Sequence, residues 1–261
     1  HYSAFKVAEN FSVLQSFYPG RIELGIGRAP GSDQETARAL AYPKPVADIN
    51  HFPQQVVDLV GFLSGTLPEE HLFYNIKAQP GPPSPTIPGI WLLGSSDYSA
   101  RLAAALGLPF SFADFFGTTA EHGPMIAELY RQHFRPSGYL EEPKFNVALQ
   151  VVCADSQEKA NSIISSRNIS RINSLKGIRE PLISPEEAAA IDLTPFELQH
   201  IEMANRFLIS GTPDVVKRGI LQASEEYGTK DISIATNCYN FDDRIRSFKL
   251  IAEAFSLTEP E

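Results

Sequence analysis

The sequence predicts an α/β fold in which parallel strands alternate with helices. Strand-like and helix-like stretches follow one another along nearly the whole chain. An apolar strand that begins at Trp91 runs through Gly94 and two serines directly into an Ala-rich helix that reaches Gly107. A length of 261 residues also suits a single α/β barrel domain. We therefore expect one domain over residues 1–261.

In the first part of the chain, apolar spacing predicts two helices and a strand. Residues 3–17 place apolar side chains on one helical face, and residues 52–64 repeat this pattern. Residues 22–27 alternate apolar and other side chains with a period of two, as a strand does. Residues 29–50 are polar and rich in proline, which predicts an irregular connection.

A proline-dense stretch follows at residues 65–89. Its six prolines exclude a long helix, although residues 73–77 fit a short strand: Pro68, Pro80, Pro82, Pro83, Pro85 and Pro88. A second apolar strand is expected at 110–113, and Asp114-Phe-Phe116 would lie at its carboxyl end. These aromatic rings could face a ligand ring system, although aromatic residues in strands usually belong to the core. Asp114 could act as a general base or cap the next segment.

The second half of the chain continues the alternation. Helices are expected at 121–134 and 241–256, and strands at 146–154 and 231–236. Ser156 has the character of a helix start.

Residues 167–209 predict an irregular insertion into the barrel. Ser184 and Thr194 each precede a proline, the pattern of a helix start, and Thr212-Pro213 opens a helix that reaches about Tyr227.

The turn after Trp91 predicts an anion site. A strand, small residues and a helix N-terminus together present free N–H groups and the positive end of the helix dipole. The hydroxyls of Ser95, Ser96 and Ser99 beside Gly94 can add donors, and phosphate is the expected guest. The alternative is that Ser95 or Ser96 only caps the helix.

A second segment supplies a cation at an equivalent place. Gly27 and Arg28 follow the strand at 22–27 in a Gly-rich loop. Ligands gather at the carboxyl ends of parallel strands, so Arg28 could share one anion with Ser95 and Ser96. The alternatives are that Arg28 forms a surface ion pair and that Gly27 only serves a turn.

Two motifs are specific enough to compare with known families: Gly27-Arg-Ala-Pro-Gly31 and Leu93-Gly-Ser-Ser-Asp-Tyr-Ser-Ala100. Five further segments support them in the same order along the chain: 5–14, 18–26, 106–113, 151–155 and 242–253. Together they resemble the bacterial luciferase-like flavin monooxygenase family, in particular its small single-chain oxidoreductases. The resemblance covers nearly the whole chain.

This resemblance implies a TIM (β/α)₈ barrel with a flavin at its carboxyl face. It implies a cofactor site made of Gly27, Arg28, Gly94, Ser95, Ser96 and Tyr98. The implied function is a monooxygenase that uses oxygen, a small organic substrate and FMN reduced by a separate flavin reductase. A homodimer is also implied. Family members have further sequence before the position of His1, so we expect the first barrel strands to be missing from this chain.

Three other functions stay open at this point. A deazaflavin in place of FMN would make a hydride-transfer enzyme. The chain could instead be a flavin-binding protein without catalysis, or a sugar-phosphate enzyme on the same barrel. The absence of a Gly-x-Ser-x-Gly or His-Glu-x-x-His motif fits flavin chemistry, in which the cofactor reacts and the protein orients it.

Composition excludes several classes of partner. A formal net charge of -9 without a Lys/Arg cluster argues against nucleic acid. The sequence has no run of 18 apolar residues, so no membrane span is predicted, and its start has no signal-peptide pattern. Cys153 and Cys238 are expected as free thiols in a cytoplasmic protein. None of the six histidines has metal-ligand spacing; His51 and His122 could line a pocket but fit surface positions better.

Overall fold

The computed structural model describes residues 2–29, 33–46, 48–80, 87–117 and 120–257. The chain divides into two compact units, which are described separately. The first unit comprises His1–Ser111 and Leu129–Lys144, and the second comprises Phe112–Glu128 and Phe145–Glu261.

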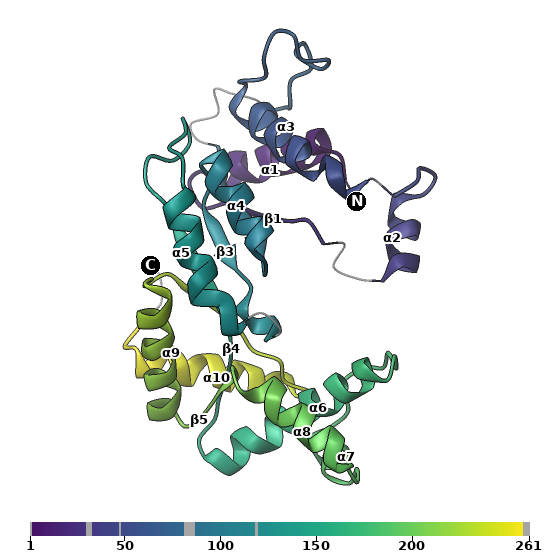
Figure 1. The fold of residues 1–261 in the computed structure, drawn as a ribbon, viewed down its shortest axis with the longest axis vertical. Coiled ribbons are helices and arrows are strands. Elements are labelled where there is room, and N and C mark those ends of the chain that lie inside the picture. Colours follow the sequence, from purple (N-terminus) through teal and green to yellow (C-terminus); the bar gives the residue numbers. More distant parts are fainter. Residues whose placement is uncertain (1, 30–32, 47, 81–86, 118–119, 258–261) are drawn as a thin grey trace. The chain divides into compact units, whose positions relative to one another are not determined.

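The first unit begins with an α-helix and continues with two strands, three more α-helices and a short 3₁₀ helix (Figure 1). Its elements are α1 (Ala4–Phe17), β1 (Glu23–Gly27), α2 (Gln34–Ala41), the short 3₁₀ helix η1 (Ile49–His51), α3 (Phe52–Ser64), β2 (Gly89–Gly94) and α4 (Asp97–Leu106). Two elements pass from one unit to the other along the chain: β3 (Phe110–Phe112) and α5 (Gly123–His133).

The strands of the first unit are parallel. β1 pairs with β2 from Glu23 opposite Gly89 to Gly27 opposite Leu93. Helices α1 and α3 contact each other, and their apolar faces join the two strands in one core. The buried members of this core are Ala8, Leu24, Leu59, Phe62, Leu63, Leu67, Ala78 and Ile90.

The second unit is built around β4 (Phe145–Cys153), whose side chains are nearly all buried. Its other elements are η2 (Asp114–Phe116), η3 (Ala120–His122), α6 (Gln157–Leu175), α7 (Pro185–Ala189), α8 (Pro195–Asn205), β5 (Ile209–Gly211), α9 (Pro213–Tyr227), β6 (Ile232–Ala235) and α10 (Phe241–Ala254). β4 pairs in parallel with both β5 and β6, so it is the middle strand of the three. A continuous apolar strand is typical of a parallel sheet covered on both faces.

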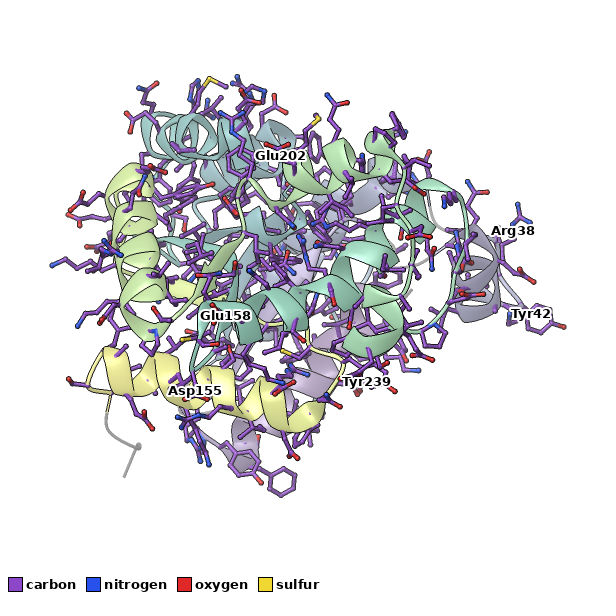
Figure 2. All side chains as sticks on the ribbon, turned by 90° about the horizontal axis from the view of Figure 1, so that it is seen from below. Arg38, Tyr42, Asp155, Glu158, Glu202 and Tyr239 are labelled. Carbon is purple, nitrogen blue, oxygen red and sulfur yellow. The ribbon has the colours of Figure 1, made fainter. Side chains whose placement is uncertain are left out.

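Helix α10 is tied to β4 by polar contacts. The backbone N–H of Cys153 donates to Oγ of Ser247, which is fully buried, at 2.8 Å. Just after β4, Asp155 accepts from Nη2 of Arg246 at 2.6 Å, beside α10 (Figure 2). Both contacts fix the helix against the end of the central strand.

The predicted helix starts are confirmed. Ser156 caps α6 by accepting from the N–H of Lys159. Ser184 and Thr194 each form a complete capping box, in which Glu187 and Glu197 accept from the N-cap backbone. Helix α9 begins at Pro213 and ends at Tyr227, as expected. Cap residues followed by proline therefore predicted three helices correctly.

Two predictions were wrong. Residues 29–50 contain a helix, α2, which Asp33 caps by accepting from the N–H of Thr36 at 2.7 Å. Only Ala37 of α2 is buried, so the helix adds little to the core. Residues 73–77 form turns and not a strand, because the N–H of Phe73 donates to Nδ1 of His71 and other backbone groups pair locally.

The region predicted as an irregular insertion contains regular structure. Residues 167–209 include the second half of α6, all of α7 and α8, and the first residue of β5. β5 was not predicted, since it has three residues and no alternating pattern. The proposed single-domain organisation stays a prediction.

The parallel strands and intervening helices confirm the predicted α/β class, with the barrel only partly formed. Within the described part of the chain, no helix is both long and apolar enough to span a membrane. Both cysteines are free; Cys153 is buried and Cys238 is half-buried.

Candidate functional site

The ends of β1 and β2 bring the predicted anion-binding residues to one edge. Because the strands are parallel and Gly27 pairs with Leu93, Arg28 and Gly94 are the next residues at the same edge. Ser95 and Ser96 follow and lead into α4. The helix therefore begins at the edge where Arg28 leaves β1.

Gly94 is required by the tight entry into α4. A Cβ atom at this position would overlap the side chain of Ser99, which is buried in the first turn of the helix. Gly27 differs, because within the described residues the nearest atom to a Cβ there would be the carbonyl oxygen of Leu93, at 3.9 Å. Among the described residues, a side chain at position 27 would therefore be accommodated without a clash.

Ser96 occupies the N-cap position of α4, but its hydroxyl makes no cap hydrogen bond. Its Oγ lies 3.5 Å from Oγ of Ser99. The N–H of Tyr98 donates to its neighbour Asp97 at 2.8 Å. Ser96 thus does not cap α4 through its hydroxyl, which instead pairs weakly with the hydroxyl of Ser99.

Arg28 is exposed, and its guanidinium carbon lies 4.1 Å from the centre of the Tyr98 ring. A cation over an aromatic face is held electrostatically without losing its charge. Within the described ranges, Arg28 forms no ion pair, so the surface ion-pair alternative is not observed. Two of the predicted site residues are therefore in direct contact.

Other candidates lie elsewhere. His51 and His122 are exposed. Asp114 is the first residue of η2; it is buried and accepts a hydrogen bond from the hydroxyl of Tyr227 at 2.5 Å. Burial raises the pKa of Asp114 above its ordinary range, against the opposing effect of the Tyr227 hydrogen bond. Phe112 is a core residue that packs against Tyr227. No metal-binding group of three acidic, His or Cys side chains occurs in the part of the chain described.

A second site, in the second unit, is a cavity of about 550 Å³. Phe115 and Phe116 from η2 form part of its wall, as do Arg167 and Arg171 from α6. Sequence reasoning missed these arginines because residues 167–209 gave few signals. A signal was present: Arg167, Ser170, Arg171 and Ser174 follow the three- and four-residue spacing of one helical face.

Both arginines of the cavity are held by neutral oxygens. Arg167 is 5% exposed and donates to Oε1 of Gln150 at 2.6 Å and to Oδ1 of Asn205 at 2.7 Å. Arg171 donates to the carbonyl oxygen of Phe116 at 3.0 Å. Burial, and then the nearby Arg171, lower the pKa of Arg167 to about 10, so it stays charged at neutral pH.

Comparison with known proteins identifies the class. A family model for luciferase-like monooxygenases matches residues 1–230. The chain belongs to the luciferase-like monooxygenase family, and it is an enzyme of this monooxygenase class. The family resemblance and the barrel type predicted from the sequence are thereby confirmed.

Three relatives illustrate the similarity. YwcH of Bacillus subtilis is 37% identical over 257 residues, 98% of this chain and 76% of YwcH. A luciferase-like monooxygenase of Escherichia coli K12 is 34% identical over 250 residues, 96% of this chain and 72% of that protein. An N-acetyl-S-alkylcysteine monooxygenase of B. subtilis is 32% identical over 256 residues, 97% of this chain and 74% of that protein.

Solved structures show the same fold. Apo-MsnO8 matches with a TM-score of 0.84 at 28% identity, covering 98% of this chain and 75% of that one. The oxygenating constituent of 3,6-diketocamphane monooxygenase from Pseudomonas putida, solved with FMN, gives 0.61 at 18% identity, covering 100% and 78%. An F420-dependent secondary alcohol dehydrogenase gives 0.63 at 13% identity, covering 99% and 76%. The last two likenesses concern the fold alone.

Proposed function

We propose that the protein is an FMN-dependent monooxygenase that acts with oxygen on a small organic substrate. The observation that carries this proposal is the shared edge of β1 and β2, where a cation and hydroxyl groups meet the start of α4. When bound, reduced FMN would supply the electrons for oxygen activation. Family membership supports the monooxygenase class, and the FMN-bound relative supports the cofactor.

The residues at this edge fit a phosphate group. We propose that Arg28 supplies positive charge and that Ser95 and Ser96 donate hydroxyl hydrogen bonds. Gly27 and Gly94 keep the backbone free of side chains beside the group. Tyr98 holds the guanidinium of Arg28 in place through its ring.

The proposal also covers partners. A separate flavin reductase would provide the reduced cofactor, and the enzyme would act as a cytoplasmic homodimer. Neither nucleic acid nor a membrane is a proposed partner. A relative that acts on N-acetyl-S-alkylcysteine supports a small organic substrate of this general size.

The phosphate assignment is tested by comparing two flavins. Arg28→Ala should weaken FMN binding at least tenfold and change riboflavin binding little, because riboflavin has no phosphate. Fluorescence titration of each flavin measures both constants. Arg38→Ala, which removes an exposed charge on α2 (Figure 2), is the matched control and should change neither. Equal losses for FMN and riboflavin in Arg28→Ala would reject the phosphate role.

The second candidate is a deazaflavin-dependent hydride-transfer enzyme. The F420-dependent dehydrogenase among the structural neighbours is the observation that favours it. Titration with F420 beside FMN separates the two. Tighter binding of F420, with no oxygen uptake when reduced FMN and substrate candidates are supplied, would replace the FMN proposal.

A further inference from the structure

The cavity of the second unit has a strongly one-sided charge. The face of α6 that carries Arg167, Ser170, Arg171 and Ser174 forms most of its polar lining, and Phe115 and Phe116 form its aromatic wall. The other polar lining residues are Gln150, His200 and Asn237. Leu175 and Leu182 add apolar surface. A cavity of about 550 Å³ lies in the size range of small-molecule sites.

No described carboxylate pairs with either arginine. In the described segments, neither arginine is within ion-pair distance of a carboxylate. The acceptors of Arg167 are two amide oxygens, and the acceptor of Arg171 is a backbone carbonyl. These satisfy hydrogen bonds but leave two positive charges in a partly buried space.

Such an arrangement is energetically costly. A buried charge normally has a partner of opposite sign, and a second like charge one helical turn away adds repulsion. A purely structural role would explain the contact from Arg167 to Gln150 and Asn205. It would not explain why a second arginine lines the same cavity, where both guanidinium groups keep further N–H donors.

We propose that this cavity binds the anionic end of the organic substrate, a carboxylate, sulfonate or phosphate, through Arg167 and Arg171. The assignment rests on the proposed function, because it names the substrate class for that enzyme. Arginine forks suit such anions, since two parallel N–H groups meet two oxygens. Phe115 and Phe116 would contact the apolar remainder of the molecule.

The test uses two probes that differ in charge and hardly in shape, phenylacetate and phenylacetamide. Calorimetric titration of the whole protein should show at least tenfold tighter binding of the carboxylate. Arg171→Gln should remove this preference and leave phenylacetamide binding unchanged. Arg218→Gln, which removes an exposed charge on α9, is the matched control and should keep the preference. Arg167→Lys, which retains the charge at the more buried position, should weaken phenylacetate binding less than Arg171→Gln.

Two results would overturn the proposal: equal binding of the two probes by the unmodified protein, or an unchanged carboxylate preference in a folded Arg171→Gln variant. Thermal unfolding confirms that each variant is folded. FMN and riboflavin titrations of Arg171→Gln distinguish the source of the anion. A selective loss of FMN binding would assign the cavity to the cofactor phosphate and reject the substrate assignment. Absence of any flavin binding, with the carboxylate preference intact, would reject the proposed function and keep the anion site.

Discussion

Arg28 in the first unit and Arg167 in the second are both candidate anion ligands, but the protein holds them in different ways. Arg28 is exposed and rests over one face of Tyr98. Arg167 is 5% exposed and is fixed by side chains from β4 and α8. Arg28 contacts a side chain of one helix, α4, whereas Arg167 links its own helix α6 to β4 and α8.

The difference determines what a substitution at each site can report. An exposed cation contributes little to folding, so its loss is seen mainly in ligand binding. A buried cation and its acceptors form one network, so removing any member also changes stability. Binding data for the second unit therefore need unfolding data beside them, while those for the first unit do not.

The largest expected effect is on the buried network. Gln150→Leu removes an acceptor of Arg167 and leaves part of a buried guanidinium without a partner. We expect a loss of about 3 kcal/mol in the free energy of unfolding, measured by urea denaturation. Gln222→Leu removes an exposed contact to Glu226 on α9 and should cost less than about 0.5 kcal/mol. Similar losses in both variants would mean that the buried network contributes no more than a surface contact.

The next effect concerns Tyr227 and depends on pH. Tyr227→Phe removes the donor to the buried Asp114, and we expect a loss of about 2 kcal/mol at neutral pH. Burial raises the pKa of Asp114 in the folded state above its unfolded value near 3.9. The folded protein is therefore destabilised as pH rises from the unfolded pKa through the folded pKa, because ionising the buried carboxyl costs free energy. The hydrogen bond reduces this penalty. The loss caused by Tyr227→Phe should therefore shrink as pH falls and Asp114 takes up its proton.

Tyr130 provides the matched control in the first unit. The single proton of its hydroxyl is shared between the carbonyl oxygens of Leu108 and Lys144, at 2.9 and 3.1 Å, and its oxygen accepts from the N–H of Lys144. None of these three backbone groups titrates, so Tyr130→Phe should cost about 1 to 2 kcal/mol and depend less on pH between 4 and 8 than Tyr227→Phe does. Urea denaturation at several pH values measures both variants. A flat profile for Tyr227→Phe would contradict the role given to Asp114.

The first unit shows what local sequence can predict. Gly94, the serines and Arg28 each follow a strand, and parallel strands must bring such residues to one edge. Their contact with the ligand is still a prediction. That they lie at the same edge of the sheet could be predicted from the positions of the strand ends in the sequence. The ring of Tyr98 under Arg28 was not predictable in the same way, since residues 28 and 98 meet only through the register of β1 and β2.

The second unit shows where local sequence fails. Arg167 meets Gln150 and Asn205, which are 17 and 38 residues away in the chain. Nothing near Arg167 marks it as buried, because arginine on a helix is usually exposed. Asp114 and Tyr227 are 113 residues apart and have no common pattern. Capping residues, whose partners lie three residues away, were predicted correctly at Ser184 and Thr194.

The smallest expected effect separates the ring of Tyr98 from its hydroxyl. An exposed cation–π contact contributes about 0.5 to 1 kcal/mol, so Tyr98→Leu should leave unfolding nearly unchanged and weaken FMN binding only about threefold. Tyr98→Phe keeps the ring under Arg28 and should bind FMN as the unmodified protein does. Fluorescence titration measures both variants. If Tyr98→Phe loses as much affinity as Tyr98→Leu, the hydroxyl of Tyr98 contacts the ligand directly, and the contact between the ring and Arg28 contributes little to FMN binding.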